Sequence, residues 1–367
     1  MSSNVASVPL PRQMSDVTPA WLSGALQAAG HDVEVDSVVA TPLGVGIGMM
    51  SGLQSLALTY SEGTGPALLV LKMPAENDAN RAVADLYHLY ERETRFYREV
   101  APKSSAYTPI VYRADIDGNN FVLLMEHLTD YTLGDQVTGC TLEETRGGVA
   151  WLARHHASLW GQTEDPAFAF LPEVSPSYSS EGLMQGCAFG WGPMTELFAH
   201  VVPERIAALK DRYLAVLPML FEWMATPPLT VVHGDFRMDN LFFGSQPGQE
   251  PLIAVDWQGS LRGRASQDIA YFFSGSLPTE LRRKHERALI NQWHAGLVAG
   301  GVTGFSADDA WNDYRKAMLY VWVMAVVISG TLDPTNERGR RWISVMLERS
   351  IAAIDDLDLV GLMDEMA

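Results

Sequence analysis

The sequence is poor in cysteine and in positive charge. Only Cys140 and Cys187 occur among 367 residues, with no C-x-x-C spacing, so we expect neither a disulfide framework nor a zinc site. Lysine and arginine together number 26 against 44 aspartates and glutamates, which gives a formal net charge of -18. Nucleic acids are bound by clustered lysine and arginine, so this balance argues against a nucleic-acid partner.

Long apolar runs are also missing. The longest, residues 317–328, has 12 residues, whereas about 20 are needed to cross a bilayer, so we interpret it as a buried helix and expect no membrane partner. The first residues do not follow the basic, apolar and small-residue order of a signal peptide. Together with the few cysteines, these features predict a cytoplasmic protein. The length allows about two domains and leaves the oligomeric state open.

One short stretch of the sequence concentrates polar side chains behind an apolar lead. His233 and Asp235 follow two valines in a tight turn, and Asn240 comes five residues after Asp235. A second apolar run, residues 252–255, ends at Asp256. In phosphoryl transfer one carboxylate orients a hydroxyl, while an amide and a second carboxylate hold metal ions against the phosphates. The order and spacing of Asp235, Asn240 and Asp256 match that arrangement.

A glycine-rich segment with Gly44, Gly46 and Gly48 lies between two predicted strands, at residues 33–43 and 53–60. Glycines let a backbone approach a ligand closely, as over nucleotide phosphates. A dinucleotide-binding fingerprint would require a helix directly after the glycines, but a strand follows. The strand–loop–strand order is that of kinases, and the alternative is a glycine-rich hairpin without a ligand.

A lysine and a glutamate form a second candidate pair. Lys72 ends a predicted strand at residues 67–71; such a lysine is commonly an edge residue, but the upstream glycines favour a phosphate-binding role. Residues 80–100 are predicted as a helix, and Glu93 falls within its apolar stripe. A buried carboxylate needs a partner, for which Lys72 is the candidate. The alternative places Glu93 at the rim of that stripe.

The remaining segments predict two lobes. Strands at residues 109–115 and 120–126 flank an Asp-Gly turn, and the loop after them is predicted as the hinge. The lobes would be an N-terminal lobe of residues 1–127 and a C-terminal lobe of residues 128–367. Further expected elements are a helix at residues 142–160, an irregular insertion at about 161–193, helices at about 194–226 and three helices at about 279–357.

Two polar features of the C-terminal lobe are interpreted as structural. His155 and His156 are adjacent in a predicted helix, so they point about 100° apart and are poorly placed to bind one metal ion. Asp268 precedes the apolar residues 269–273 and is interpreted as a helix N-cap.

These motifs resemble those of the aminoglycoside phosphotransferase and choline kinase-like superfamily, over about residues 30–330. Residues 256–258 and 268–273 look closest to the ecdysteroid kinase-like branch, whereas residues 233–240 also look like phosphotransferase domains acting on hydroxyacyl-CoA. The resemblance implies an α+β, two-lobed protein-kinase-like fold. Its N-terminal lobe would hold an antiparallel sheet plus a helix, and its C-terminal lobe would be mainly helical.

The resemblance also implies ATP and Mg²⁺ as cofactors and assigns roles in the C-terminal lobe. Asp235 would orient or deprotonate the acceptor hydroxyl, and His233 would brace the catalytic loop. Asn240 and Asp256 would bind Mg²⁺ that bridges the ATP phosphates.

In the N-terminal lobe the resemblance implies the nucleotide-binding residues. Lys72 would pair with the α and β phosphates of ATP and be positioned by Glu93. Gly44, Gly46 and Gly48 would cover the phosphates.

Two departures from protein kinases concern the substrate. Gly234 stands where those enzymes carry an arginine, and no Ala-Pro-Glu sequence follows Asp256. Both departures favour a small-molecule acceptor and constitutive activity. We therefore predict phosphoryl transfer to a hydroxyl of a small molecule.

The aromatic residues of the segment 161–193 favour an apolar acceptor of steroid or hydroxyacyl type. The alternatives are an aminoglycoside phosphotransferase and, from another class, a nucleotide-binding pseudokinase scaffold. A hydrolase is a third alternative, but the Gly-x-Ser-x-Gly nucleophile motif is missing from the sequence.

Overall fold

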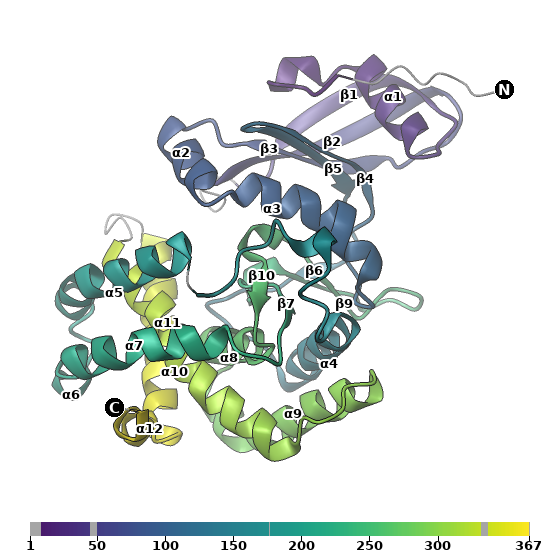
Figure 1. The fold of residues 1–367 in the computed structure, drawn as a ribbon. Coiled ribbons are helices and arrows are strands. Elements are labelled where there is room, and N and C mark those ends of the chain that lie inside the picture. The colour runs from purple at the N-terminus through teal and green to yellow at the C-terminus, as the bar shows by residue number, and fades with distance from the viewer. Residues whose placement is uncertain (1–8, 45–49, 176, 332–336, 367) are drawn as a thin grey trace. The chain divides into compact units, whose positions relative to one another are not determined.

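The chain divides into two compact units in a computed structural model that describes residues 9–44, 50–175, 177–331 and 337–366. Figure 1 labels the helices and strands. The N-terminal unit comprises Met1–Pro102 and Thr108–Asp130, and the C-terminal unit comprises Lys103–Tyr107 and Tyr131–Ala367.

The N-terminal unit is built on a five-stranded antiparallel sheet with the order β1-β2-β3-β5-β4 (Figure 1). Helix α1 (Pro19–Ala28) contacts β1; Thr18 caps its first turn, and Gly30 follows its end with φ of 93°. Leucines of the sheet and of α1 are fully buried together and form the core of this unit. The strands are β1 (Glu34–Pro42), β2 (Ser51–Glu62), β3 (Leu68–Pro74), β4 (Val111–Asp117) and β5 (Asn120–Glu126).

The register of the sheet fixes the position of Lys72. In the central strand β3, Lys72 lies opposite Leu53 of β2 and opposite Leu123 of β5. Both neighbouring strands therefore hold the backbone around this lysine by ladder hydrogen bonds.

The expectation of one uninterrupted helix at residues 80–100 is wrong, because two α-helices form, but a π-helical segment (Phe96–Val100) continues the second one to the expected end. Helices α2 (Asp78–Leu86) and α3 (Leu89–Arg95) are separated at His88, whose φ is 53°. The break lets α3 bury Tyr90, whose ring stacks on Phe121 at 4.4 Å between centroids. Burial of this ring against the sheet offsets the interruption of the helix.

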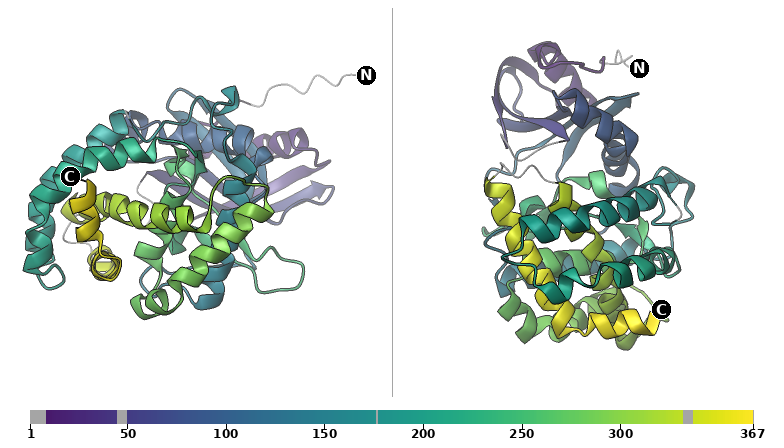
Figure 2. Two further views of the ribbon diagram at one scale, coloured as in Figure 1. Left: turned by 60° about the horizontal axis from the view of Figure 1, so that its bottom comes forward. Right: turned by 90° about the vertical axis from the view of Figure 1, so that its left-hand side faces the viewer.

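The C-terminal unit contains two small sheets and most of the helices (Figures 1 and 2). Strand β7 (Thr230–Val232) pairs with β10 (Leu261–Gly263), and β6 (Thr132–Leu133), β8 (Leu241–Phe243) and β9 (Leu252–Ala254) form the other sheet. The helices are α4 (Leu142–Leu159), α5 (Tyr178–Leu197), α6 (Glu204–Ala207), α7 (Lys210–Met224), α8 (Ser266–Ser276), α9 (Thr279–Ala299), α10 (Ala307–Thr331), α11 (Glu337–Asp356) and α12 (Leu359–Met366).

The irregular insertion expected at residues 161–193 is wrong for its second half, which belongs to α5. Ser177 caps this helix by accepting a hydrogen bond from the amide of Ser180. The glycines that suggested irregular structure serve helix packing, since Gly190 lies directly against Gly330 of α10. Small residues at this point let the backbones of α5 and α10 approach closely.

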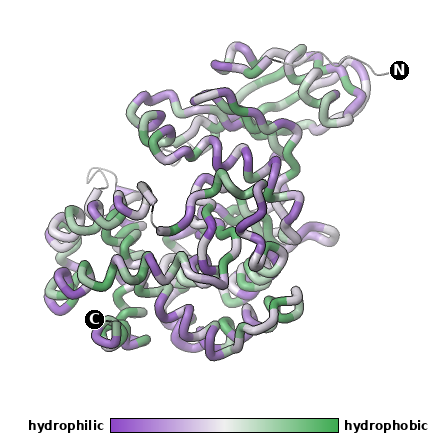
Figure 3. Tube along the Cα trace, in the orientation of Figure 1, coloured by the Kyte–Doolittle hydropathy of each residue, from purple (hydrophilic) through white to green (hydrophobic). Residues whose placement is uncertain are grey.

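The three helices expected at about residues 279–357 correspond to α9, α10 and α11, and they are followed by a further helix, α12. Hydrophobic residues gather along α10 and along the strands of the N-terminal sheet (Figure 3). Among the described residues, no helix combines the length and the apolar character that crossing a membrane requires.

Two adjacent glycines of α4 allow a matched test of the packing. A Cβ added at Gly148 would lie 2.8 Å from the ring of Phe272, whereas one added at Gly147 would meet nothing within 4 Å. We expect Gly148→Ala to lower the free energy of unfolding by about 1–3 kcal/mol. Gly147→Ala should raise it by about 0.5–1 kcal/mol through helix propensity. Chemical denaturation measures both, and equal effects would contradict the packing.

Candidate active site

The polar turn after β7 is a tightly constrained loop in the C-terminal unit. Gly234 has φ of 80°, and a Cβ added there would overlap the carbonyl oxygen of Gly259. The glycine is therefore required by the backbone conformation and by this close approach. The structure thus supplies a local reason for the glycine that the sequence showed only as a departure from protein kinases.

Asp235 and Asn240 contact each other within this loop. The Nδ2 of Asn240 donates to Oδ2 of Asp235 and to the carbonyl oxygen of Asp235, at 2.9 Å in each case. The side chain of Asp235 is 31% exposed, whereas Asn240 is buried. The carboxylate of Asp235 is thus oriented by the loop and still reachable from outside.

The β8–β9 hairpin brings Asp256 to the same end of the unit. Leu241 pairs with Ala254, and the amide of Val255 donates to the carbonyl oxygen of Asn240 at 3.0 Å. Asp256 follows directly with φ of 66°, a left-handed conformation that aspartate tolerates better than most residues. Asn240 and Asp256 are therefore neighbours through backbone pairing.

The oxygen atoms that could bind a metal at this end of the β8–β9 hairpin suit Mg²⁺. Because Nδ2 of Asn240 donates to Asp235, its Oδ1 is the atom suited to a cation, and Asp256 adds a carboxylate. Mg²⁺ prefers such oxygen ligands, commonly one or two from protein, with phosphates and water as the others. Within the described residues, no group of three or more His, Cys, Asp or Glu side chains is arranged to hold a metal.

His233 links the loop to the hairpin. Its Nδ1 accepts from the amide of Asp235 at 3.2 Å, and its Nε2 lies 3.0 Å from the carbonyl oxygen of Val255, to which it donates. Burial lowers the pKa of His233 against the opposing influence of Asp268 and nearby carboxylates. The neutral ring therefore joins the segments that carry Asp235 and Asp256.

Asp268 holds the same loop, a role that the sequence interpretation missed. It lies within α8, whose N-cap is Ala265, so its assignment as an N-cap is wrong. Its fully buried carboxylate accepts from the amides of His233 (2.7 Å) and Gly234 (2.9 Å). His156 adds a third contact at 3.1 Å. Burial opposes the charge, but the bonds from His156 and His233 outweigh it and lower the pKa of Asp268.

The structural role of Asp268 could have been suspected from one signal in the sequence, an acidic residue embedded in an apolar helix. Its histidine partner could not, because His156 lies on α4, far away in sequence. The structural interpretation of His156 agrees with this contact. The Nε1 of Trp293 donates to the other ring nitrogen at 3.3 Å.

In the N-terminal unit, Lys72 and Glu93 form the ion pair that the sequence predicts. The Nζ of Lys72 lies 2.8 Å from Oε1 and 2.7 Å from Oε2 of Glu93, and both residues are almost fully buried. Gly44 has φ of 64°, a conformation that favours glycine, with nothing within 4 Å of an added Cβ. Gly46 and Gly48 lie outside the described residues.

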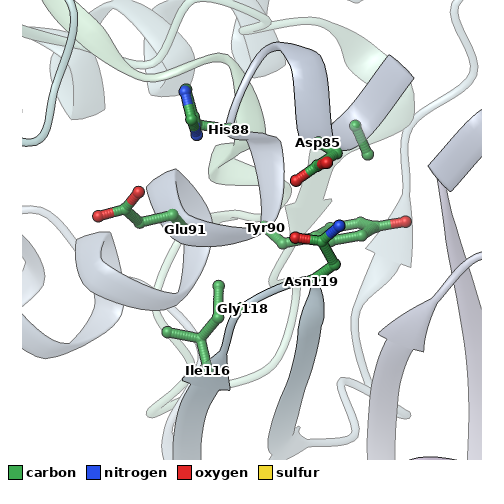
Figure 4. A pocket seen from close by; sticks show the side chains of 8 residues that line it. Asp85, His88, Tyr90, Glu91, Ile116, Gly118 and Asn119 are labelled. Atoms are coloured by element: carbon green, nitrogen blue, oxygen red, sulfur yellow. The ribbon is translucent and has the colours of Figure 1, made fainter. Parts of the chain in front are cut away.

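A cavity of about 370 Å³ in the N-terminal unit lies beside α3 (Figure 4). It contains none of the predicted site residues. The side chains around it come from α2, the α2–α3 turn, α3 and the β4–β5 hairpin, and include Asp85, His88, Tyr90, Glu91, Ile116 and Asn119.

The buried His155 makes stability depend on pH. It contacts Ser104 Oγ at 2.9 Å and stacks on Trp151; burial, assisted by repulsion from His156, lowers its pKa from 6.5 to about 3. Below pH 6.5 the unfolded chain takes up a proton that the folded chain does not. This contribution to stability is therefore complete above pH 6.5 and is lost as the pH falls toward 3.

We expect His155→Gln, which removes the titration, to flatten the pH dependence of unfolding. Between pH 7.5 and pH 5 the wild type should lose about 2 kcal/mol more than this variant. Urea denaturation at the two pH values measures the difference, with the exposed His200→Gln as control. A variant with the wild-type pH dependence would contradict the assignment.

Comparisons with solved structures identify the fold. A protein from Ralstonia eutropha, provisionally described as an aminoglycoside phosphotransferase, has a TM-score of 0.53 at 16% identity, covering 93% of this chain and 97% of its own. A GDP complex of a mutant aminoglycoside 2'-phosphotransferase of type IIIa has a TM-score of 0.53 at 14% identity, covering 90% and 95%. A choline kinase from Cryptosporidium parvum has a TM-score of 0.50 at 12% identity, covering 89% of each chain.

These identities are low, so the likenesses show the fold, and they confirm the expected α+β kinase-like architecture. A search of curated proteins finds no match. The sequence model of the Ecdysteroid kinase-like family matches residues 46–300, which supports phosphotransfer to a small molecule as the class of activity. Because this match spans more than half of the 367 residues, the protein belongs to the Ecdysteroid kinase-like family.

Proposed function

We propose that the protein transfers the γ-phosphoryl group of ATP to a hydroxyl group of a small molecule, with Mg²⁺ as the metal. The observation that carries the proposal is the linkage of Asp235, Asn240 and Asp256 in one unit. Asn240 donates to Asp235, and its carbonyl oxygen accepts from Val255, the residue before Asp256. A carboxylate, an amide and a second carboxylate in this order are what phosphoryl transfer requires.

Asp235 acts in this proposal on the acceptor hydroxyl. A hydroxyl that donates to its carboxylate is held with a lone pair free for attack, and the carboxylate takes the proton as the bond to phosphorus forms. His233 and Asp268 hold the loop, so the carboxylate is oriented before substrate arrives. Asn240 and Asp256 would hold Mg²⁺, which when bound neutralises charge on the phosphates.

Lys72 supplies positive charge for the α and β phosphates in this proposal. Its ion pair with Glu93 fixes the ammonium group in a buried setting, where a charge without a partner is costly. Gly44, Gly46 and Gly48 remain the proposed cover of the phosphates.

For the acceptor we propose an apolar alcohol of steroid type. The family name supports this class, since it refers to ecdysteroids. The aromatic residues of the segment 161–193 differ in burial, since Phe168 and Trp191 are buried core residues whereas Phe189 is 72% exposed. The proposal places the reaction in the cytoplasm and takes the partner to be a small molecule, with no nucleic acid or membrane.

The function is tested by incubating the protein with Mg²⁺, labelled ATP or GTP and one of four acceptor classes: steroids, hydroxyacyl-CoA esters, choline or aminoglycosides. The measurement is the transfer of label to each acceptor. We expect transfer to the steroid class. Asp235→Ala should slow transfer by about 100-fold or more and leave nucleotide affinity within a few-fold, because it removes only the group that acts on the hydroxyl. The exposed Asp308→Ala serves as control.

Each other outcome of this assay corrects one part of the proposal. Nucleotide binding without transfer to any acceptor would favour a pseudokinase scaffold. Absence of both nucleotide binding and phosphoryl transfer would overturn the proposed function. Full activity of Asp235→Ala would contradict the assignment of that residue alone, and preference for aminoglycosides would contradict the acceptor class.

A further inference from the structure

Arg237 is held between two carboxylates of the loop that carries Asp235. Its Nε lies 3.1 Å from Oδ1 and 3.3 Å from Oδ2 of Asp235, and its Nη1 lies 2.8 Å from Oδ2 of Asp239. Asp239 is itself fixed, because its Oδ1 accepts from the amide of Gln136 at 3.0 Å. The planar guanidinium group can thus fix the direction of the Asp235 carboxylate, which a flexible ammonium group does less well.

An aromatic ring from another part of the chain covers the guanidinium group. The ring of Trp342, on α11, has its centroid 5.3 Å from Cζ of Arg237, a cation–π distance. The indole N–H of Trp342 is buried and has no hydrogen-bond partner in the described part of the chain. The face of the ring, and not its N–H, is therefore the part of Trp342 that meets the loop.

Arg237 is well suited to stay charged and immobile in this setting. Its side chain is 19% exposed. Burial opposes the charge, but Asp235, Tyr271 and Asp239 outweigh it and raise the pKa of Arg237 above its ordinary value. The ring limits the rotamers of a long side chain that would otherwise lose its orientation.

Only one residue of this contact, Arg237, lies within the part of the chain that the family model matches. The family match ends at residue 300, whereas α11 begins at Glu337. Trp342 therefore brings to the loop of Asp235 a constraint that the matched residues do not contain.

We propose that Trp342 and Arg237 form a positioning pair that aims the carboxylate of Asp235 at the acceptor hydroxyl. Asn240 donates to Oδ2 of this carboxylate, and the Nε of Arg237 lies nearer to Oδ1 than to Oδ2. The ring of Trp342 acts through Arg237 and touches no reacting group. The inference rests on the proposed function, because it assigns a purpose to the orientation of Asp235.

Four variants test the pair: Trp342→Leu, Trp342→Phe, Arg237→Met and Arg237→Lys. With the best acceptor, we expect Trp342→Leu to lower kcat about tenfold and Arg237→Met about 100-fold, the range for residues that orient a reacting group. KM for ATP and the Kd of MgADP should stay within about twofold. Trp342→Phe, which keeps a ring face, should retain most of the activity, and Arg237→Lys should recover part of what Arg237→Met loses.

The double variant Trp342→Leu/Arg237→Met separates positioning from general stability. If the ring acts only through Arg237, the double variant falls no further than Arg237→Met. Trp311→Leu is the matched control, because Trp311 on α10 covers Arg287 on α9 at 4.5 Å in the same unit. This control should keep wild-type kcat.

The remaining outcomes distinguish failure of the proposed positioning pair from failure of the proposed function. Unchanged kcat in Trp342→Leu, losses that multiply in the double variant, or an equal loss in Trp311→Leu would overturn the pair while leaving phosphoryl transfer intact. A parallel loss of MgADP affinity would show a merely structural role. A wild type that transfers phosphate to no acceptor would overturn both proposals.

Discussion

The structure of the candidate site depends on one buried carboxylate. Asp268 is fully buried and accepts hydrogen bonds from the amides of His233 and Gly234 and from His156, and both histidines are fully buried as well. A buried charge is tolerated only when such donors surround it, and the donors in turn would be costly if left without an acceptor. The carboxylate of Asp268 therefore joins helices α4 and α8 to the loop after β7.

Hydrogen bonds connect the segment held by Asp268 to the polar side chains of the candidate site. His233 joins the amide of Asp235 to the carbonyl oxygen of Val255, and Asn240 is bonded to both of those residues. Gly234 permits the turn, because any side chain there would overlap Gly259. The positions of Asp235, Asn240 and Asp256 thus follow from the backbone conformation of the loop together with the hydrogen bonds of two buried side chains, His233 and Asn240.

Spacing in the sequence predicted the residues of the candidate site, but not the contacts that hold them. The apolar stripe around Glu93 predicted its pairing with Lys72, since a carboxylate on a buried face needs a partner. Asp268 was misread because a polar residue before an apolar run also describes an N-cap. The break at His88, the helical α5 and the contact of Trp342 with Arg237 depend on tertiary packing, which no local pattern encodes.

Hydrogen exchange of the His233 and Gly234 amides in Asp268→Asn tests most directly whether Asp268 holds the loop. The variant keeps the size of the side chain but offers one acceptor oxygen instead of two. We predict that exchange of these amides accelerates about tenfold or more, while the amides of β7 exchange as in the wild type. Unchanged exchange at both amides would contradict the central place given to Asp268.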